Sequence, residues 1–368
     1  ANSLIKFKKL YYKVLQTFRK YFLPGFIFQS LIIGGGYGTG REIVEFFLKF
    51  GPVHGLWNML ITTIIWSVVL ALCFELCRIG KTYNYQSFIK DLLGKFWIAY
   101  EVLYIFGMIL VLSVMGSASG DIINQMIGLD HFFGVCIMMF LVSFMVFKGS
   151  VFIEKIFSYW SIVLYCGFGI LFILAINNFS IEIIDAFQNQ DRNTSLWKGG
   201  VKYAAYNIGL APAIFFCTKH LKSKNEAIFS GLLAGAIGIL PAFFMYISML
   251  SFNSDVLQST FPVNIVLDAL GYDYLKIFFQ IILFGTFIET GASLIHGLNQ
   301  RVFDSFSNVS NNHRITFSLI ALVISIFLSE KIGLIKLISN GYGMITWGYW
   351  LVFVIPVLII GSIKIFKK

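Results

Sequence analysis

Long apolar stretches, separated by short polar loops, follow one another along almost the whole chain. About 20 consecutive apolar residues are enough for a helix to cross a bilayer. The pattern therefore predicts about ten transmembrane helices, at residues 24–48, 53–77, 96–124, 131–147, 153–176, 198–219, 226–252, 273–300, 314–330 and 343–363. The expected fold class is an all-α polytopic membrane protein.

Two of these stretches are interrupted in the middle by residues that break helices. The stretch 24–48 contains GGGYGTGRE, and the stretch 198–219 contains NIGLAP. Backbone that leaves the helix inside a membrane is tolerated only where it faces protein or a water-filled cavity. We therefore expect helices 1 and 6 to be unwound at mid-membrane, at residues 34–38 and 207–211, with the two segments close together.

The interrupted stretches are the first and the sixth of ten, so the chain divides into two halves of five helices. An odd number of helices per half gives the second half the opposite orientation, and matching broken helices in inverted repeats are typical of secondary transporters. We predict repeats at 24–176 and 177–363, a basic amphipathic segment at 1–23 and a short tail at 364–368.

Composition and charge support a membrane protein and narrow its partners. The chain is 58% hydrophobic and 12% charged, whereas soluble proteins carry about 25% charged residues. The net charge of +10 lies in alternate short loops rather than in one patch, so no nucleic-acid partner is expected. Because Lys-rich and Arg-rich loops face the cytoplasm, we predict a plasma-membrane protein with both termini cytoplasmic. The lipid bilayer is its expected surroundings, and the sequence leaves monomer and homodimer open.

Three sequence strings carry a resemblance to a known family: IIGGGYGTGREIVEFF, YAAYNIGLAPA and GTFIETGASLIHGLNQR. They resemble the YkvI-like branch of the amino acid–polyamine–organocation superfamily, whose members have the LeuT-type fold. The resemblance covers about 24–363. It implies a helix bundle against a scaffold, with a solute site between helices one, three, six and eight.

Candidate substrate-binding residues lie at the two breaks and on the helices expected beside them. Glycine lacks a Cβ atom and lets a solute approach the main chain, and amides at a restarted helix can hold a carboxylate. The alternatives are a glycine packing face, a capping role for the asparagine, and ordinary packing for the serine and tyrosine. The candidates are Gly34, Gly35, Gly36, Gly38, Thr39, Asn207, Gly209, Ser117 and Tyr206.

Three charged residues follow the first break and are candidates for a gate. Arg41 and Glu45 are four residues apart and would pair on one helix face. In the functional interpretation, Arg41 belongs to an outer gate and Glu42 contacts a substrate ammonium group. In the structural interpretation, all three are a local charge cluster in an aqueous vestibule.

Glu289 lies in the middle of the eighth apolar stretch, and a carboxylate in a membrane is costly enough that a functional role is the default. Thr286 and Ser293 share its helix face, and Thr290 lies beside it. We expect these four residues to couple transport to an ion. A proton carried by Glu289 is the favoured interpretation, and Na⁺ near Gly34, Thr290 and Ser293 is the alternative. A hydrogen-bonded structural Glu is also possible.

These features predict an ion-coupled secondary active transporter, a symporter or exchanger that moves a small organic solute by alternating access. An amino acid or another amine is the expected solute. The sequence has no GxxxxGK[ST] motif for ATP, no HExxH motif and no nucleophile arrangement, so we expect neither an enzyme nor a cofactor. The alternative is a LeuT-fold solute-binding sensor without net transport.

Overall fold

The computed structural model describes residues 13–148, 150–188, 197–303 and 311–367. Within these residues the secondary structure is helical, without a strand, so the all-α prediction is confirmed. The α-helices are α2 (Leu23–Ile32), α3 (Gly35–Gly38), α4 (Arg41–Phe46), α5 (Pro52–Gly80), α6 (Tyr85–Leu93), α7 (Trp97–Ile127), α8 (His131–Lys148), α9 (Ser150–Gln188), α10 (Lys198–Ile208), α11 (Lys224–Leu250), α12 (Asn253–Gln258), α13 (Pro262–Leu270), α14 (Asp273–Phe303), α15 (Asn311–Ile332), α16 (Leu334–Lys336), α17 (Gly343–Tyr349) and α18 (Ser362–Phe366). Tighter or wider helical turns form η1 (Leu48–Phe50), η2 (Gly94–Phe96), η3 (Ala211–His220), η4 (Leu337–Tyr342), η5 (Trp350–Val354) and η6 (Val357–Gly361).

Seven helical stretches of the described chain are long and apolar enough to cross a membrane. The two predicted broken helices and the predicted span at 131–147 do not reach this length and hydropathy individually, although α2 and His131–Val146 are apolar. A count of ten spans therefore stays a prediction. The seven stretches are Pro52–Gly80, Tyr85–Ile127, Val163–Gln188, Lys224–Leu250, Asp273–Ile295, Ile315–Ile332 and Leu334–Phe366.

The first predicted helix is divided into three short pieces. Helix α2 ends at Ile32, and Ile33 and Gly34 are extended before the single turn of α3. Gly40 has φ of +84°, in the left-handed region that favours glycine, and turns the chain into α4. The structure thus differs from the predicted range. Residues Gly35–Gly38 keep a helical turn, and the interruptions lie on either side of it.

The sixth predicted helix changes its type instead of losing its helical dihedrals. Helix α10 ends at Ile208, Gly209 and Leu210 form a turn with right-handed dihedrals, and η3 continues as a 3₁₀ helix. Pro212, which has no amide hydrogen, lies in the first turn of η3, where that donor is not needed. The predicted non-helical segment 207–211 is therefore a transition from α-helix to 3₁₀ helix.

The repeats at 24–176 and 177–363 stay a prediction, although the fifth helix is longer than expected. Helix α9 passes the predicted boundary at 176 and continues to Gln188, with non-helical dihedrals only at Phe179. In the described part of the predicted N-terminal segment, Lys20 forms an ion pair of 2.6 Å with Glu226 at the start of α11. Residues 1–12 of the predicted N-terminal segment lie outside the described residues.

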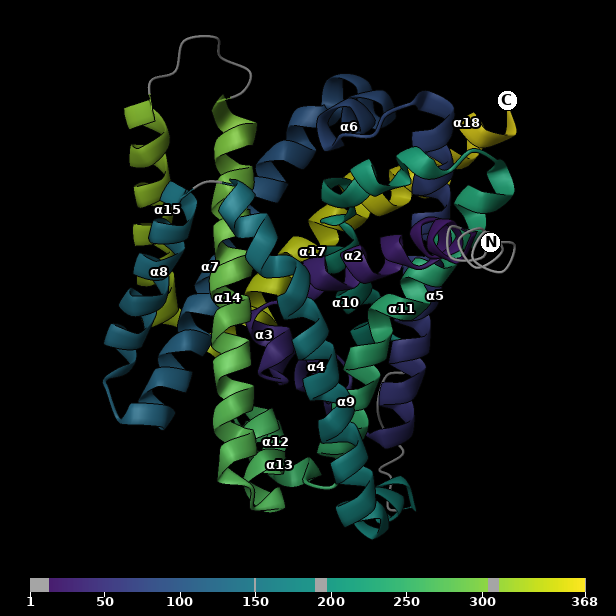
Figure 1. Ribbon diagram of the computed structural model, residues 1–368. Helices are drawn as coiled ribbons and strands as arrows, with labels where there is room; N and C mark the ends of the chain where they lie inside the picture. Colours follow the sequence, from purple (N-terminus) through teal and green to yellow (C-terminus); the bar gives the residue numbers. More distant parts are fainter. Residues whose placement is uncertain (1–12, 149, 189–196, 304–310, 368) are drawn as a thin grey trace, which may run out of the picture.

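Small residues let the central helices approach closely. In Figure 1, α11, α9 and α14 run in similar directions, whereas α2 crosses among them. Helix α11 packs along α5, and Cβ atoms added at Gly231 or Gly235 would lie 2.3–2.4 Å from backbone atoms of Ala71 and Ser67. Such glycine contacts commonly hold helices together in membranes. Here they join α11 closely to α5.

Candidate functional site

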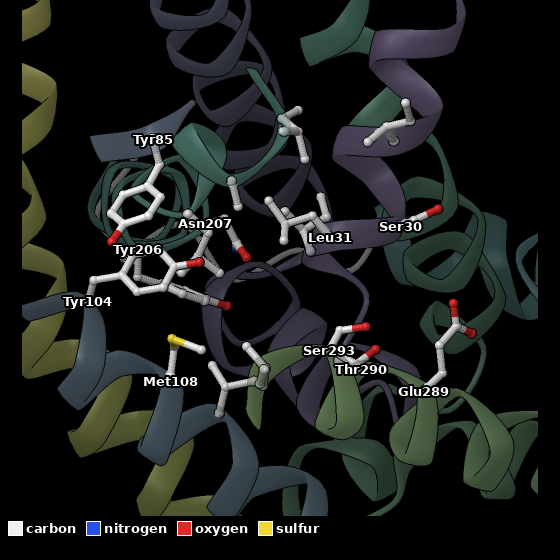
Figure 2. A pocket seen from close by; sticks show the side chains of 18 of the residues that line it. Ser30, Leu31, Tyr85, Tyr104, Met108, Tyr206, Asn207, Glu289, Thr290 and Ser293 are labelled. Atoms are coloured by element: carbon white, nitrogen blue, oxygen red, sulfur yellow. The ribbon is translucent and has the colours of Figure 1, made fainter. Parts of the chain in front are cut away.

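A cavity of about 370 Å³ lies where the pieces of the first helix meet α7, α10, η3 and α14. Figure 2 shows most of its side chains. Its lining comes from six parts of the sequence that are far apart, and two of these parts are the interrupted helices that were expected to lie close together. The lining residues are Ile27, Ser30, Leu31, Ile32, Gly34, Glu42, Tyr85, Tyr104, Met108, Val111, Tyr206, Asn207, Leu210, Ala213, Ile214, Glu289, Thr290, Ser293, Leu294 and Tyr342.

The cavity has two chemically different walls, which Figure 2 shows on opposite sides. Tyr85, Tyr104, Tyr206 and Met108 gather on one side, and the oxygens of Glu289, Thr290 and Ser293 lie on the other. The charged side chains in the lining are both carboxylates, Glu42 and Glu289. The described lining therefore favours a cation over an anion.

Glu42 lies at the junction of the two interrupted helices. It follows the Gly40 turn and is only 2% exposed. One carboxylate oxygen accepts a hydrogen bond from the Tyr206 hydroxyl, and the ring of Tyr206 stacks on Tyr342 with centroids 4.6 Å apart. The same carboxylate accepts a hydrogen bond from the backbone of Tyr37 in α3. Glu42 thus connects α4, α3 and α10.

Arg41 lies next to Glu42 in sequence but points toward a different part of the protein. Its guanidinium donates to the carbonyl oxygens of Leu257 and Ser259, at 2.8 and 3.0 Å, and lies 3.6 Å from the Glu45 carboxylate. Glu45 in turn pairs with Lys49. The structure thus contains the ion pair expected from the sequence. It adds one bond to the end of α12 and one to the segment that follows it.

The segment after α12 is bound to the first helix at a second point. The amide of Val263 in α13 donates to the carbonyl oxygen of Thr39, at 3.1 Å. Asn264, also in α13, donates to Gln125 of α7. Together with the Arg41 contacts, these bonds hold α12 and α13 against α7 and the α4 end of the first helix.

Glu289 and its neighbours on α14 form the oxygen-lined wall of the cavity, and they face α2. A second cavity of about 10 Å³, lined by Gln29, Ser30, Ile33, Leu164, Thr286, Glu289 and Thr290, lies between α2 and α14. A volume of this size suits one water molecule or small ion. The hydroxyl of Thr286 donates to the Ile282 carbonyl at 2.8 Å, whereas Ser293 is exposed to the main cavity. Within the described residues, Glu289 has no ion-pair partner.

Comparisons with known proteins agree with this geometry. No protein-family model matches the chain. The sequence is 25% identical over 342 residues to the uncharacterized membrane protein YkvI of Bacillus subtilis (strain 168), covering 88% of this chain and 91% of that protein. The resemblance to the YkvI-like branch is thereby confirmed.

Solved transporter structures share the arrangement of helices. MhsT in complex with L-phenylalanine superposes with a TM-score of 0.65 at 15% identity, over 93% of this chain and 97% of MhsT. The inward-facing conformation of Mhp1 gives a TM-score of 0.60 at 12% identity, over 88% and 72%. The chain has the LeuT-type fold. A manganese transporter of Eremococcus coleocola has the same fold, with a TM-score of 0.57 at 12% identity, over 95% of this chain and 79% of that protein. All three of these neighbours are transporters, and the chain is an integral membrane protein.

Several glycines that were predicted to bind substrate lie in contacts between helices instead of lining the cavity. A Cβ atom at Gly35 would lie 2.7 Å from the backbone of Met115 in α7. One at Gly38 would lie 2.8 Å from Leu283 in α14. The Thr39 hydroxyl donates to the carbonyl of Gly36 at 3.2 Å. These residues shape the glycine turn, and Gly34 is the glycine that reaches the cavity surface.

Two further candidates lie apart from the cavity. A Cβ atom at Gly209 would lie 2.2 Å from the ring of Tyr349, and the Gly209 carbonyl accepts a hydrogen bond from Tyr100. The carbonyl of Ser117 lies 3.0 Å from a ring nitrogen of His131 in α8, so Ser117 belongs to the packing of α7 on α8. Of the predicted substrate-binding set, Gly34, Tyr206 and Asn207 line the cavity.

The sequence analysis missed most of the aromatic wall. Tyr104 and Met108 are four residues apart on α7 and share one helix face, a signal that was available. Tyr85 begins α6, in a stretch interpreted as a loop between two predicted spans. Tyr342 reaches the site from η4, more than 130 residues after Tyr206, and no local pattern indicates that contact.

Proposed function

We propose that this protein is an ion-coupled secondary active transporter, a symporter or exchanger, that moves a small organic amine by alternating access. The main support for this proposal is the cavity at the two interrupted helices. The cavity is lined by two acidic residues, Glu42 and Glu289, and its described lining contains no basic residue. Contacts of Arg41 and Val263 close the α4 end, and the cavity lies on the α2 side of that closure. An arrangement closed at one end and hollow on the other is what one state of an alternating-access cycle requires.

In this proposal, one group of cavity residues binds the solute and another group binds the coupling ion. Glu42 binds the ammonium group of the solute, while Asn207 and the main chain at Gly34 complete its surroundings. Glu289, Thr290 and Ser293 couple transport to an ion, with a proton on Glu289 as the favoured mode. In the alternative mode, Na⁺ binds the Thr290 and Ser293 hydroxyls and the main chain near Gly34. Carboxylate, hydroxyl and carbonyl oxygens are suitable for either role.

An organic cation fits this site better than a transition metal. One structural neighbour is a manganese transporter, and manganese prefers clusters of oxygen ligands, carboxylates above all. The described residues contain no group of three or more His, Cys, Asp or Glu side chains positioned to hold a metal ion. The tyrosines and Met108 instead suit the carbon skeleton of an amine.

Counterflow in proteoliposomes tests the proposal against the sensor alternative. Vesicles preloaded with a bound, unlabelled amine should take up the same labelled amine faster than empty vesicles. A solute-binding sensor would bind that amine, measured by a thermal shift, yet show no counterflow. Both termini cytoplasmic, a plasma-membrane location and a monomeric or homodimeric state are parts of the same proposal.

A further inference from the structure

The space beside the glycine turn of the first helix is already occupied by the carboxyl group of Glu42. The first amides of any helix lack partners within that helix, so the α3 turn is where a solute carboxylate would be expected to bind. In this chain a Cβ atom at Gly36 would lie 2.5 Å from Oε1 of Glu42. The backbone of Tyr37 is hydrogen-bonded to that carboxylate. The space and the donor beside the turn are therefore both occupied by the protein.

No basic group of the described residues pairs with this carboxyl group. Arg41 is engaged by Leu257, Ser259 and Glu45, and the described cavity lining contains no Lys, Arg or His. Glu289 adds a second carboxylate to the same cavity. A solute carboxylate would therefore have two carboxyl groups and no cationic partner around it in the described lining.

We propose that the solute is an amine without a carboxylate group, and that Glu42 takes the place that the carboxylate of an amino acid would occupy at the glycine turn. The ammonium group pairs with Glu42, and the remainder of the solute lies against the wall formed by Tyr85, Tyr104 and Met108. This inference rests on the proposed function and narrows its substrate class from amines in general to decarboxylated ones. Aromatic faces next to a carboxylate are suited to bind organic cations.

Thermal-shift and calorimetric titrations of the full-length wild-type protein with matched compounds test this class. The probes are phenethylamine, L-phenylalanine and 3-phenylpropionate, which share a phenyl ring and differ in their ammonium and carboxylate groups. We expect phenethylamine to bind at least 10-fold more tightly than either of the others. Equal or tighter binding of L-phenylalanine overturns the inference, as does the absence of binding by phenethylamine and by the aliphatic amines n-butylamine and n-hexylamine.

Variants at Glu42 provide a second readout. Glu42→Gln should weaken phenethylamine binding at least 10-fold, whereas Glu182→Gln, at an exposed position of α9, should leave it unchanged. Glu42→Ala vacates the space beside Gly36 and should reverse the preference toward L-phenylalanine. If these variants do not fold, the wild-type titrations still decide. Counterflow of L-phenylalanine would support transport and overturn the substrate class, whereas phenethylamine binding without counterflow would support the class and contradict transport.

Discussion

The hydroxyl of Tyr206 donates a hydrogen bond to the carboxylate of Glu42, and this bond joins the two interrupted helices at the cavity. The residues are 164 positions apart. Because Tyr206 also stacks on Tyr342, the bond fixes the carboxylate relative to η4 as well. Any movement of α4 away from α10 must break it.

Replacing Tyr206 by Phe removes the donor and keeps the ring. Hydrogen bonds to charged groups contribute about 1.5–3 kcal/mol, so we expect Tyr206→Phe to weaken amine binding by roughly 10-fold or more. Calorimetry with phenethylamine measures this change. Tyr342→Phe is the matched control, since it retains both the stack and the Tyr206–Glu42 bond. An unchanged Kd in Tyr206→Phe would show that this bond does not orient Glu42.

Adding a single methyl group at Gly36 should have a large effect on binding. The Cβ atom would lie 2.5 Å from Oε1 of Glu42 and 2.7 Å from Ile338, so Gly36→Ala must displace the carboxylate. We expect amine binding to fall below detection while the detergent-solubilised protein stays monodisperse. Gly343→Ala is the control, because a Cβ atom there meets nothing within 4 Å. Wild-type affinity in Gly36→Ala would argue against the close packing of Glu42 on the turn.

The sequence predicted the interruptions better than it predicted their form. Five glycines and the NIGLAP string identified both places where helices end, because glycine and proline act locally. Whether Gly35–Gly38 unwinds or keeps one turn depends on its packing against Met115, which lies 80 residues away in the sequence. The partner of Glu42 is equally non-local. Spacing indicated the pair of Arg41 and Glu45, and the position of Tyr206 beside the second break made it a candidate, but nothing in the sequence indicates that Tyr206 bonds to Glu42.

Glu289 should separate solute exchange from ion-driven accumulation. Glu289→Gln keeps the shape of the side chain but cannot release a proton. If protons drive transport, the variant should retain exchange of labelled amine in proteoliposomes and lose accumulation driven by a pH gradient. If Na⁺ drives it, Thr290→Ala or Ser293→Ala should weaken the Na⁺ dependence of binding instead. Wild-type accumulation by Glu289→Gln under a pH gradient alone would exclude Glu289 as the proton carrier.

The contacts of Arg41 should control access to the α4 end of the cavity. Val263 bonds to Thr39, two residues before Arg41, and is fully buried, so Val263→Cys should react slowly with a membrane-impermeant thiol reagent in a cysteine-free background. Adding Arg41→Gln should raise that rate about 10-fold or more, because both carbonyl contacts are lost. Arg41→Lys should fall between, since one ammonium group does not reproduce the guanidinium fork. Equal rates in all three proteins would contradict a closing role.

Thiol labelling also tests the proposed orientation. Cysteines introduced at Leu129 and Gln258 should react with an impermeant reagent applied to intact cells. Cysteines at Gly80 and Lys222 should react only after permeabilisation. All four positions are exposed, so the difference reports on sidedness and not on burial. The reverse pattern would place both termini outside.

Arg41 and Glu42 are neighbours in a helix that turns about 100° per residue, and their side chains therefore leave α4 in different directions. One reaches the segment after α12, and the other reaches the solute cavity. An insertion of one residue after Gly40 would aim the guanidinium at the amine, and deletion of Arg41 would aim the carboxylate of Glu42 at two carbonyl oxygens. The stretch from Gly34 to Glu45 is thus an indivisible unit for protein engineering: a graft that alters solute preference has to carry the closing contacts with it.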